Sequence, residues 1–562
     1  MKSIRNLIVG MAVACSAGFL VSCEDLSEIN KNPNSAESVS SNYILSYVLT
    51  SSAKTHHTLA DLSQRISGTM QYAQLGTNNN AEKVNHFGWT FDAWPWSTYY
   101  DILRNVEIIY ENSEQDNNRM FKAIALILRS FTYGVATDLY GDIPYSEALK
   151  AKNGSYFPQY DEQKLIYKGI LADLREANVL LGSLDAKDGV NASADLLYKG
   201  DASKWRKFAN SLRLRYVMRL SEKKSEMSGI GVNLDEEFAD ALPNIFTSNN
   251  DDAKLDFLGT NAENSYNGGP INSSNPNYAN KIGKSFIDKL VELNDPRLHR
   301  WAEPVQIKWH PSASQVKDTT VTNIFGESYA VSLRPTQGVV EKVDTGMYVG
   351  LPAGIPVMEA LNYNKGNYTE PFRDERSPFI SFNHARYRKN QDPLIMMNMM
   401  TYAEVKFILA EAAVRGLFGV TDADRHYKEA IKASMDKWKI SDAASFDYDE
   451  YFAQPKVNLS GAADKWERVM EQKWISSWLY PESWFDWRRT GYPVLKAGSA
   501  AFYGPDLPLR FIYPTPNLDP SYLPNYQAAV SRLESTTRVP AGQSADHHYS
   551  KMWLVQGTSK PW

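Results

Sequence analysis

Cys23 is the residue whose type and position most clearly suggest a chemical modification. Cysteine occurs only twice in this 562-residue chain, at Cys15 and Cys23. Cys23 follows a basic start (Lys2 and Arg5) and an apolar run over residues 7–21. The run is shorter than the roughly 20 residues that a membrane-spanning helix needs. The pattern therefore predicts an export signal peptide over residues 1–22 that ends at a reactive thiol.

The four residues that end at Cys23, Leu-Val-Ser-Cys, resemble the lipobox of bacterial lipoproteins. In such signals the cysteine thiol is acylated and becomes the first residue of the mature protein. Buried acyl methylenes contribute about 0.8 kcal/mol each, and two or more chains give a stable anchor. A plain secretory signal with an incidental cysteine, or an uncleaved anchor, are the alternatives. Because no cysteine follows Cys23, the mature chain cannot form an internal disulfide, so packing must stabilise the fold.

Motifs that would carry catalysis are missing from the sequence. There is no His-Glu-x-x-His zinc motif, no Gly-x-Ser-x-Gly elbow, and no ligand spacing among the nine histidines. An acylated Cys23 could not act as a nucleophile. The 65 acidic residues always include pairs, but nothing singles out two of them for glycoside hydrolysis. We therefore expect no enzymatic activity and no cofactor. A structural calcium is compatible with the many oxygen ligands, although no Asp-x-Asp-x-Asp-Gly loop is present.

Charge and composition narrow the classes of partner. The whole chain has a formal charge of −5, and removal of residues 1–22 takes away Lys2 and Arg5, which leaves 58 basic against 65 acidic residues, or −7. This mild acidity argues against a nucleic-acid partner, since phosphate binding needs a basic face. Aromatic residues make up 12% of the chain, and Tyr outnumbers Phe. Aromatic-lined grooves and ordinary packing explain this content equally well.

Helical periodicity dominates most of the chain. Residues Ile124, Leu128, Phe131 and Val135 fall on one face of a helix, which should end at Gly141. Similar patterns predict helices over 161–182, 202–220 and 464–480, and a helical hairpin over 402–437. In that hairpin Arg415-Gly416 should close the first helix, and Asp422 or Asp424 could cap the second. The small–large alternation suits tetratricopeptide-like helix pairs, without a constant 34-residue period.

The helical blocks are separated by two long stretches of different amino-acid composition. Residues 240–280 and 300–400 are rich in Asn, Gly, Pro and Tyr, which predicts ordered loops with a few short strands. Loops of this length in a compact protein are usually functional. No Gly/Ser-rich or Pro-rich linker divides the chain. We expect a polar tether at 23–40 and one mainly α domain over 41–562, in which a helical-repeat scaffold packs with a loop-rich ligand-binding region.

Several local strings resemble the SusD/RagB family of surface lipoproteins, in its SusD-like branch. They lie in the family's order along the whole chain: Asn30-Lys31-Asn32-Pro33-Asn34, DLYGDIPYSEA from Asp138, Asp295-Pro296-Arg297, the stretch from Tyr402 to Ala412, WFDWRR from Trp484, and RFIYPTP from Arg510. We read these strings as mainly structural: Gly141 to Pro144 as a helix stop and turn, and Trp484 to Arg489 as residues that pack and pair inside the fold.

The resemblance implies a binding protein rather than an enzyme. It implies an outer-membrane lipoprotein on the outer surface of the cell, which captures an oligosaccharide and delivers it to a TonB-dependent transporter of the SusC type. Glu24-Asp25, directly after Cys23, resembles the acidic signal that sends such lipoproteins to the surface. Peptide import is an alternative within the family. A lipid-anchored hydrolase and a helical scaffold without a small ligand are the alternatives outside it.

Sugar rings bind by stacking on aromatic side chains and by hydrogen bonds from amides and charged groups, so we searched for aromatics mixed with amides in loops. For each group the alternative is packing in the core or in a loop. The candidates form three groups: Asn78 and Asn80 with Trp89, Trp94 and Trp96; Asn264, Tyr266 and Asn267; and Trp301 with Trp309. The first group stands early in the chain, where the starch-binding member of the family also keeps a stacking Trp.

Overall fold

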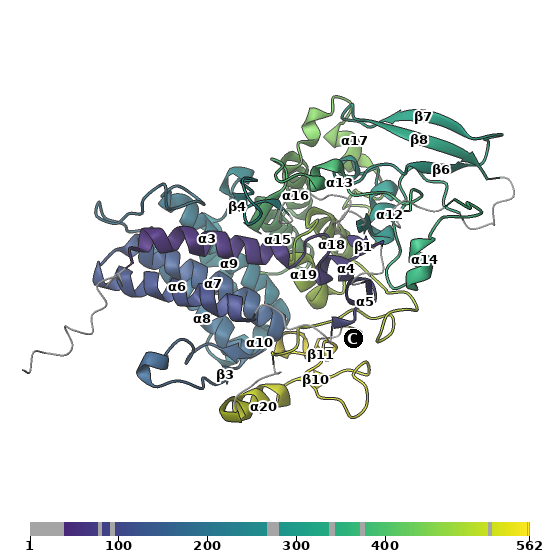
Figure 1. The fold of residues 1–562 in the computed structure, drawn as a ribbon. Coiled ribbons are helices and arrows are strands. Elements are labelled where there is room, and N and C mark those ends of the chain that lie inside the picture. Colours follow the sequence, from purple (N-terminus) through teal and green to yellow (C-terminus); the bar gives the residue numbers. More distant parts are fainter. Residues whose placement is uncertain are drawn as a thin grey trace, which may run out of the picture.

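The computed structural model describes residues 39–76, 81–89, 96–266, 280–336, 343–370, 377–514, 520–558 and 560. Figure 1 shows a block of long helices on one side, a second group of helices in the centre, and a small sheet at the far end. The described part of the chain is mainly α-helical with a few short strands, which confirms the predicted fold class.

Long helices from the first half of the chain pack side by side in the helical block (Figure 1). They are α3 (Ser41–Thr58), α6 (Trp96–Gln115), α7 (Arg119–Tyr140), α8 (Gln163–Leu181) and α9 (Ala202–Arg219). Their ends follow local chemistry. The Asn118 side chain accepts hydrogen bonds from the backbone at the start of α7, and Gly141, with a φ of 91°, ends that helix as predicted.

The predicted hairpin over 402–437 is present in the central group. It consists of α15 (Tyr402–Val414) and α16 (Ala423–Lys437), which pack together and against α18 (Lys465–Ser476). Arg415-Gly416 closes α15, and Gly416 has a φ of 64°. Asp422 occupies the N-cap position of α16, as predicted. Its backbone is left-handed, and its side chain makes no capping hydrogen bond. The helix α19 (Glu482–Thr490) follows.

Shorter helices connect these groups. They are α4 (Arg65–Thr69), α5 (Ala81–Val84), α10 (Lys224–Gly229), α11 (Leu234–Ala241), α12 (Lys284–Glu292), α13 (Leu298–Trp301), α14 (Val357–Leu361), α17 (Tyr448–Ala453) and α20 (Leu523–Ser531).

The strands are short, and two of the strand pairs, β1–β5 and β4–β9, join segments that are far apart in sequence. Antiparallel pairs join β1 (Ala73–Leu75) to β5 (Asn280–Ile282), β2 (Ile143–Pro144) to β3 (Tyr160–Asp161), β4 (Ala253–Asp256) to β9 (Met396–Met400), and β10 (Glu534–Ser535) to β11 (Ser550–Lys551).

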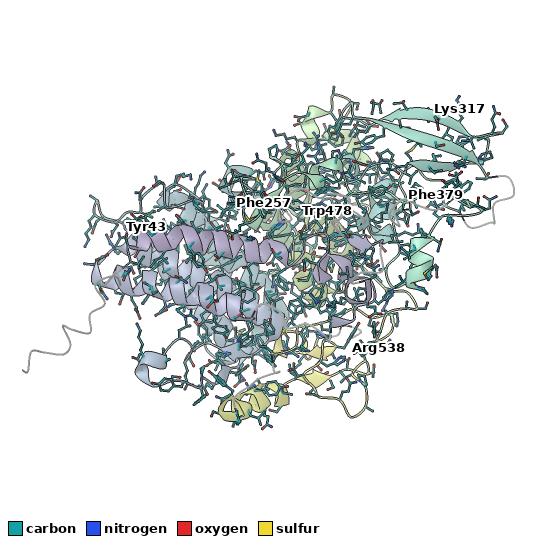
Figure 2. All side chains as sticks on the ribbon, viewed as in Figure 1. Tyr43, Phe257, Lys317, Phe379, Trp478 and Arg538 are labelled. Atoms are coloured by element: carbon teal, nitrogen blue, oxygen red, sulfur yellow. The ribbon has the colours of Figure 1, made fainter. Side chains whose placement is uncertain are left out.

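One sheet has three strands, β6 (Ile307–His310), β7 (Lys317–Thr322) and β8 (Ser328–Pro335). The order is β6-β8-β7, with β6 parallel and β7 antiparallel to β8. Lys317 marks the outer end of this sheet, away from the helices (Figure 2). The structure thus places short strands in the predicted loop region at 300–400.

A buried network of charges joins the helical block to the central group. Arg215 of α9 binds Glu404 of α15 at 2.7 and 2.8 Å, and it lies 3.3 Å from Glu482 of α19. Arg219 bridges Glu482 and Asp138 of α7. The two arginines hold the pKa of Glu482 far below its usual value, against the opposing effect of burial.

The segment Trp484 to Arg489 lies inside the fold, as predicted. Trp484 and Arg488 are fully buried, and Arg488 donates hydrogen bonds to the carbonyl oxygens of Asp138 and Leu509 at 2.7 and 2.8 Å. Arg489 pairs with Glu411 of α15. The family-like strings at 138, 402, 484 and 510 therefore meet in one core, because each supplies a partner for another.

Candidate functional site

The β1–β5 pair brings together two of the regions in which binding residues are predicted. Leu75 and Asn280 are strand partners, so β1 ends and β5 begins at the same end of this two-stranded sheet. Asn85 stabilises this end of the sheet, since its side chain accepts a hydrogen bond from Leu75 N and donates one to Leu75 O, both at 2.8 Å. Lys281 is buried beside it and donates to the carbonyl of Ser377 at 2.9 Å.

Several predicted residues fall outside the described ranges. They are Cys23, Asn78, Asn80, Trp94 and Asn267.

Two aromatic residues of the first two groups are core residues, which corrects their proposed role in stacking. Trp89 is 1% exposed and packs edge-on against Trp484 and Phe511 at 5.5 and 5.1 Å between ring centroids. Tyr266 is fully buried, and its hydroxyl donates to Asp61 at 2.5 Å. Neither ring has a free face, because rings from distant parts of the chain cover both.

The third group is corrected for the same reason. Trp301 is fully buried and stacks on Phe286 and Trp478 at 5.5 and 5.4 Å. Trp309 is 3% exposed, stacks on Phe379 at 5.2 Å and donates its indole N–H to the carbonyl of Asn364. Both tryptophans therefore form part of the buried core of the loop-rich region, although the sequence around them is polar.

Trp96 is half-buried in a cluster of tyrosines. Its ring lies 5.0 Å from Tyr140 and 5.8 Å from Tyr160, with Tyr513 edge-on at 6.2 Å. Asn264 is also half-buried, and its side-chain oxygen accepts from the backbone of Thr260 and Asn261, which closes a turn. Both side chains are engaged in local packing, with part of their surface exposed.

A groove of about 350 Å³ is the described feature that best suits a ligand. It lies between the end of α12, the start of α13, the β7–β8 turn and the segment before α17. These elements are neighbours in the upper right part of Figure 1. The volume is within the 300–1,000 Å³ of typical small-ligand sites.

Aromatic and aliphatic surfaces line this groove together with a few polar groups. Tyr348, Phe446 and His299 contribute half-buried rings, Val291 is 48% exposed, and Asn294 contributes an amide. The Tyr348 hydroxyl and His299 Nδ1 lie 2.9 Å apart and share a hydrogen bond. Burial raises the pKa of Tyr348 and lowers the pKa of His299, so both are neutral at pH 7. The pair therefore offers a fixed, uncharged ring face and polar edge.

No unpaired charge lines the described groove. Asp295 is its one acidic residue, and that carboxylate is buried against Arg297, with 2.8 Å between Arg297 Nε and Asp295 Oδ1. Tyr451 also donates to Asp295 at 2.8 Å. The groove therefore suits a neutral ligand with apolar faces and hydroxyl or amide groups.

Sequence reasoning missed the groove residues. Tyr348 lies in the string Tyr-Val-Gly-Leu-Pro, which predicts a loop but does not single out this ring as a binding residue. Val291 and Asn294 lie at the end of a helix, and Phe446 stands before a short helix roughly 150 residues later. Of the family-like strings, Asp295-Pro296-Arg297 contributes to the groove, since Asp295 and Pro296 line it.

No group of three or more His, Cys, Asp or Glu side chains among the described residues is arranged to hold a metal ion. None of the helices that the structure describes has the length and apolarity needed to cross a bilayer.

Comparison with known proteins identifies the family. The family model described as "SusD-like, starch-binding associating with outer membrane" matches residues 33–323 and 327–514. The chain belongs to this SusD-like family. The family is associated with the outer membrane and with the binding of nutrients.

Solved SusD-like structures share the fold along nearly the whole chain. A SusD homologue of Bacteroides fragilis is 24% identical, with a TM-score of 0.65 over 92% of this chain and 99% of that chain. A SusD/RagB family protein of Bacteroides thetaiotaomicron is 23% identical, with a TM-score of 0.63 over 93% and 100%. A chitin-binding protein is 25% identical, with a TM-score of 0.68 over 92% and 100%. Among curated proteins, none matches this sequence.

Proposed function

We propose that this SusD-like protein captures a neutral oligosaccharide at the groove beside Tyr348 and delivers it to a TonB-dependent outer-membrane transporter of the SusC type. The observation that carries the ligand class is the composition of the groove, which combines ring faces, an amide and no unpaired charge. Sugars need this combination because their rings have apolar C–H faces and polar rims. The starch-binding description of the family and the 25% identical chitin-binding protein support a glycan.

The same proposal includes the place of the protein in the cell. Residues 1–22 are removed on export, Cys23 is acylated, and residues 23–40 tether the domain to the outer leaflet of the outer membrane. The Leu-Val-Ser-Cys string and the acidic pair that follows it support this reading. The protein binds its ligand without converting it. A peptide is the second candidate ligand, since its neutral side chains would fit the same surfaces.

Isothermal titration calorimetry tests the proposal. The protein is the chain without residues 1–22 and with Cys23→Ser, and the probes are chito-oligosaccharides, malto-oligosaccharides, an oligogalacturonide and neutral peptides. We expect binding of a neutral oligosaccharide, no binding of the acidic one, and no change in the recovered ligand by mass spectrometry. Binding of peptides alone would replace the glycan, and hydrolysis of any probe would refute the binding-only role.

A pair of variants at one position tests the groove itself. Tyr348→Ala removes the ring face, which is worth about 1–2 kcal/mol in aromatic contacts, or roughly a 5- to 30-fold weaker Kd. Tyr348→Phe keeps the ring and removes only the hydroxyl that meets His299, so its affinity should stay close to that of the native chain. Equal affinities of the Ala variant and the native chain would place the ligand elsewhere.

A further inference from the structure

A second, smaller cavity lies in the middle of the molecule, away from the groove. It has a volume of about 40 Å³ and is lined by residues of α3, β9, α15, α16 and α18. Trp478, which lines it, is labelled near the centre of Figure 2. The cavity thus lies where the helical block meets the central helices. A buried water needs about 10–15 Å³, so this space holds one chloride-sized ion with one or two waters, and it is too small for a sugar.

Lys437 gives this cavity an unbalanced positive charge. It is the last residue of α16, it is half-buried, and its ammonium has no hydrogen-bond or ion-pair partner in the described part of the chain. The two other charged side chains in the lining are already paired. Glu404 binds Arg215 at 2.7 Å, and Lys473 binds Asp486 at 2.6 Å.

Asp252 is the acidic group whose charge Lys437 senses, but its oxygens are used elsewhere. One oxygen accepts from the backbone N–H of Tyr402 at 2.7 Å, and the other lies 3.5 Å from Lys254. Burial lowers the pKa of Lys437 to about 8, so most of the ammonium stays charged at pH 7. A half-buried ammonium without a directly bonded counter-charge is unfavourable, and an anion from solution would relieve this.

His57 of α3 supplies an independent sign of an occupant. Its side chain is 9% exposed, lines the same cavity, and leaves Nε2 without a hydrogen-bond partner among the described residues. Phe257 and Tyr266 hold the ring edge-on at 5.2 and 5.8 Å. Burial lowers the pKa of His57, so the ring is neutral and has one N–H to donate. Buried polar atoms are normally satisfied, so this nitrogen indicates a partner inside the cavity.

We propose that the cavity binds a small monovalent anion of the size of chloride, held by the Lys437 ammonium and the His57 ring N–H. A cation is disfavoured, since both lysines face the space and Glu404 is neutralised by Arg215. The anion joins α3 to the end of α16, and it therefore stabilises the junction between the helical block and the central group. Water alone would leave the Lys437 ammonium without a directly bonded counter-charge.

The test uses bromide as the probe, because it mimics chloride and scatters anomalously. Crystals of the chain without residues 1–22 and with Cys23→Ser are soaked in sodium bromide and measured at the bromine edge. The expected result is an anomalous peak in contact with Lys437 Nζ and His57. A cavity that contains only water density after the soak would overturn the proposal, and this measurement does not depend on any variant folding.

Thermal unfolding tests the site in solution. At constant ionic strength, chloride should raise the Tm of the native chain in a saturable way relative to gluconate, which is too large to enter. Lys437→Met should abolish this difference, whereas Lys428→Met, on the exposed face of the same helix and paired with Asp424, should keep it. A bromide peak in crystals with no anion-dependent Tm would mean binding at crystal concentration only, and it would overturn the proposal, as would an unchanged chloride effect in Lys437→Met.

Discussion

Neutralising Glu482 should destabilise the protein strongly, because this carboxylate pairs with two buried arginines and lies beside a buried histidine. Its oxygens lie 3.3 Å from Arg215 Nη1 and 3.6 Å from His56 Nε2, and one also contacts Arg219. All four side chains are at most 3% exposed. Glu482→Gln preserves the shape and one acceptor oxygen but removes the charge. Both arginines would then be left with fewer counter-charges in a low-dielectric environment.

The loss of stability in Glu482→Gln depends on the carboxylates that still pair with the two arginines. Removal of one partner from a buried ion pair costs about 3–5 kcal/mol. Arg215 would keep Glu404, and Arg219 would keep Asp138, so we expect the lower end, about 3 kcal/mol. Urea unfolding followed by Trp fluorescence measures the change. The control is Glu534→Gln, which breaks an exposed pair with Lys551 and should cost at most about 1 kcal/mol. A Glu482→Gln protein as stable as the control would refute the reasoning.

Three further outcomes are expected. Gly283→Ala should cost about 2 kcal/mol or more in urea unfolding, since a Cβ there would clash with the backbone carbonyl oxygen of Gln71. Gly189→Ala, with open space around it, should be neutral. Burial lowers the pKa of His548 to about 3, so this ring resists protonation in the folded state. As the pH falls from 6.5 to 4, protonation of the same ring in the unfolded state should lower the free energy of unfolding by about 1.4 kcal/mol per pH unit. His548→Gln should flatten that slope. Trp96→Ala should lower the Tm by loss of its tyrosine cluster but leave glycan affinity within about twofold, and a larger loss of affinity than in Tyr348→Ala would return the ligand to Trp96.

Much of the helical scaffold was predictable because its signals are local. The stop of α7 at Gly141 and the closure of α15 at Arg415-Gly416 depend on backbone conformations that glycine adopts easily. The strings at 138, 484 and 510 were recognisable for a related reason. Their arginines, carboxylates and aromatic rings pair with each other in the core, so their residue types are tightly constrained.

The binding residues were less predictable because exposure depends on distant neighbours. Trp301 and Tyr348 both stand within a few residues of a proline, in the predicted loop region at 300–400. Trp301 is buried because Phe286 of α12, Trp478, which follows α18, and Trp438 all pack against its ring. Tyr348 is half-buried, because the elements around it leave a groove at that point.

The sequence by itself determined the helices and the family, and it predicts a lipid anchor at Cys23, since periodicity, local strings and a signal-like N-terminal pattern are properties of neighbouring residues. Tertiary structure alone decided which aromatic rings face solvent and which charges lack a partner. Lys437 illustrates the difference: its sequence context is that of an ordinary lysine at a helix end, and only the packing of α3, α15 and α18 around it leaves the ammonium unpaired beside His57.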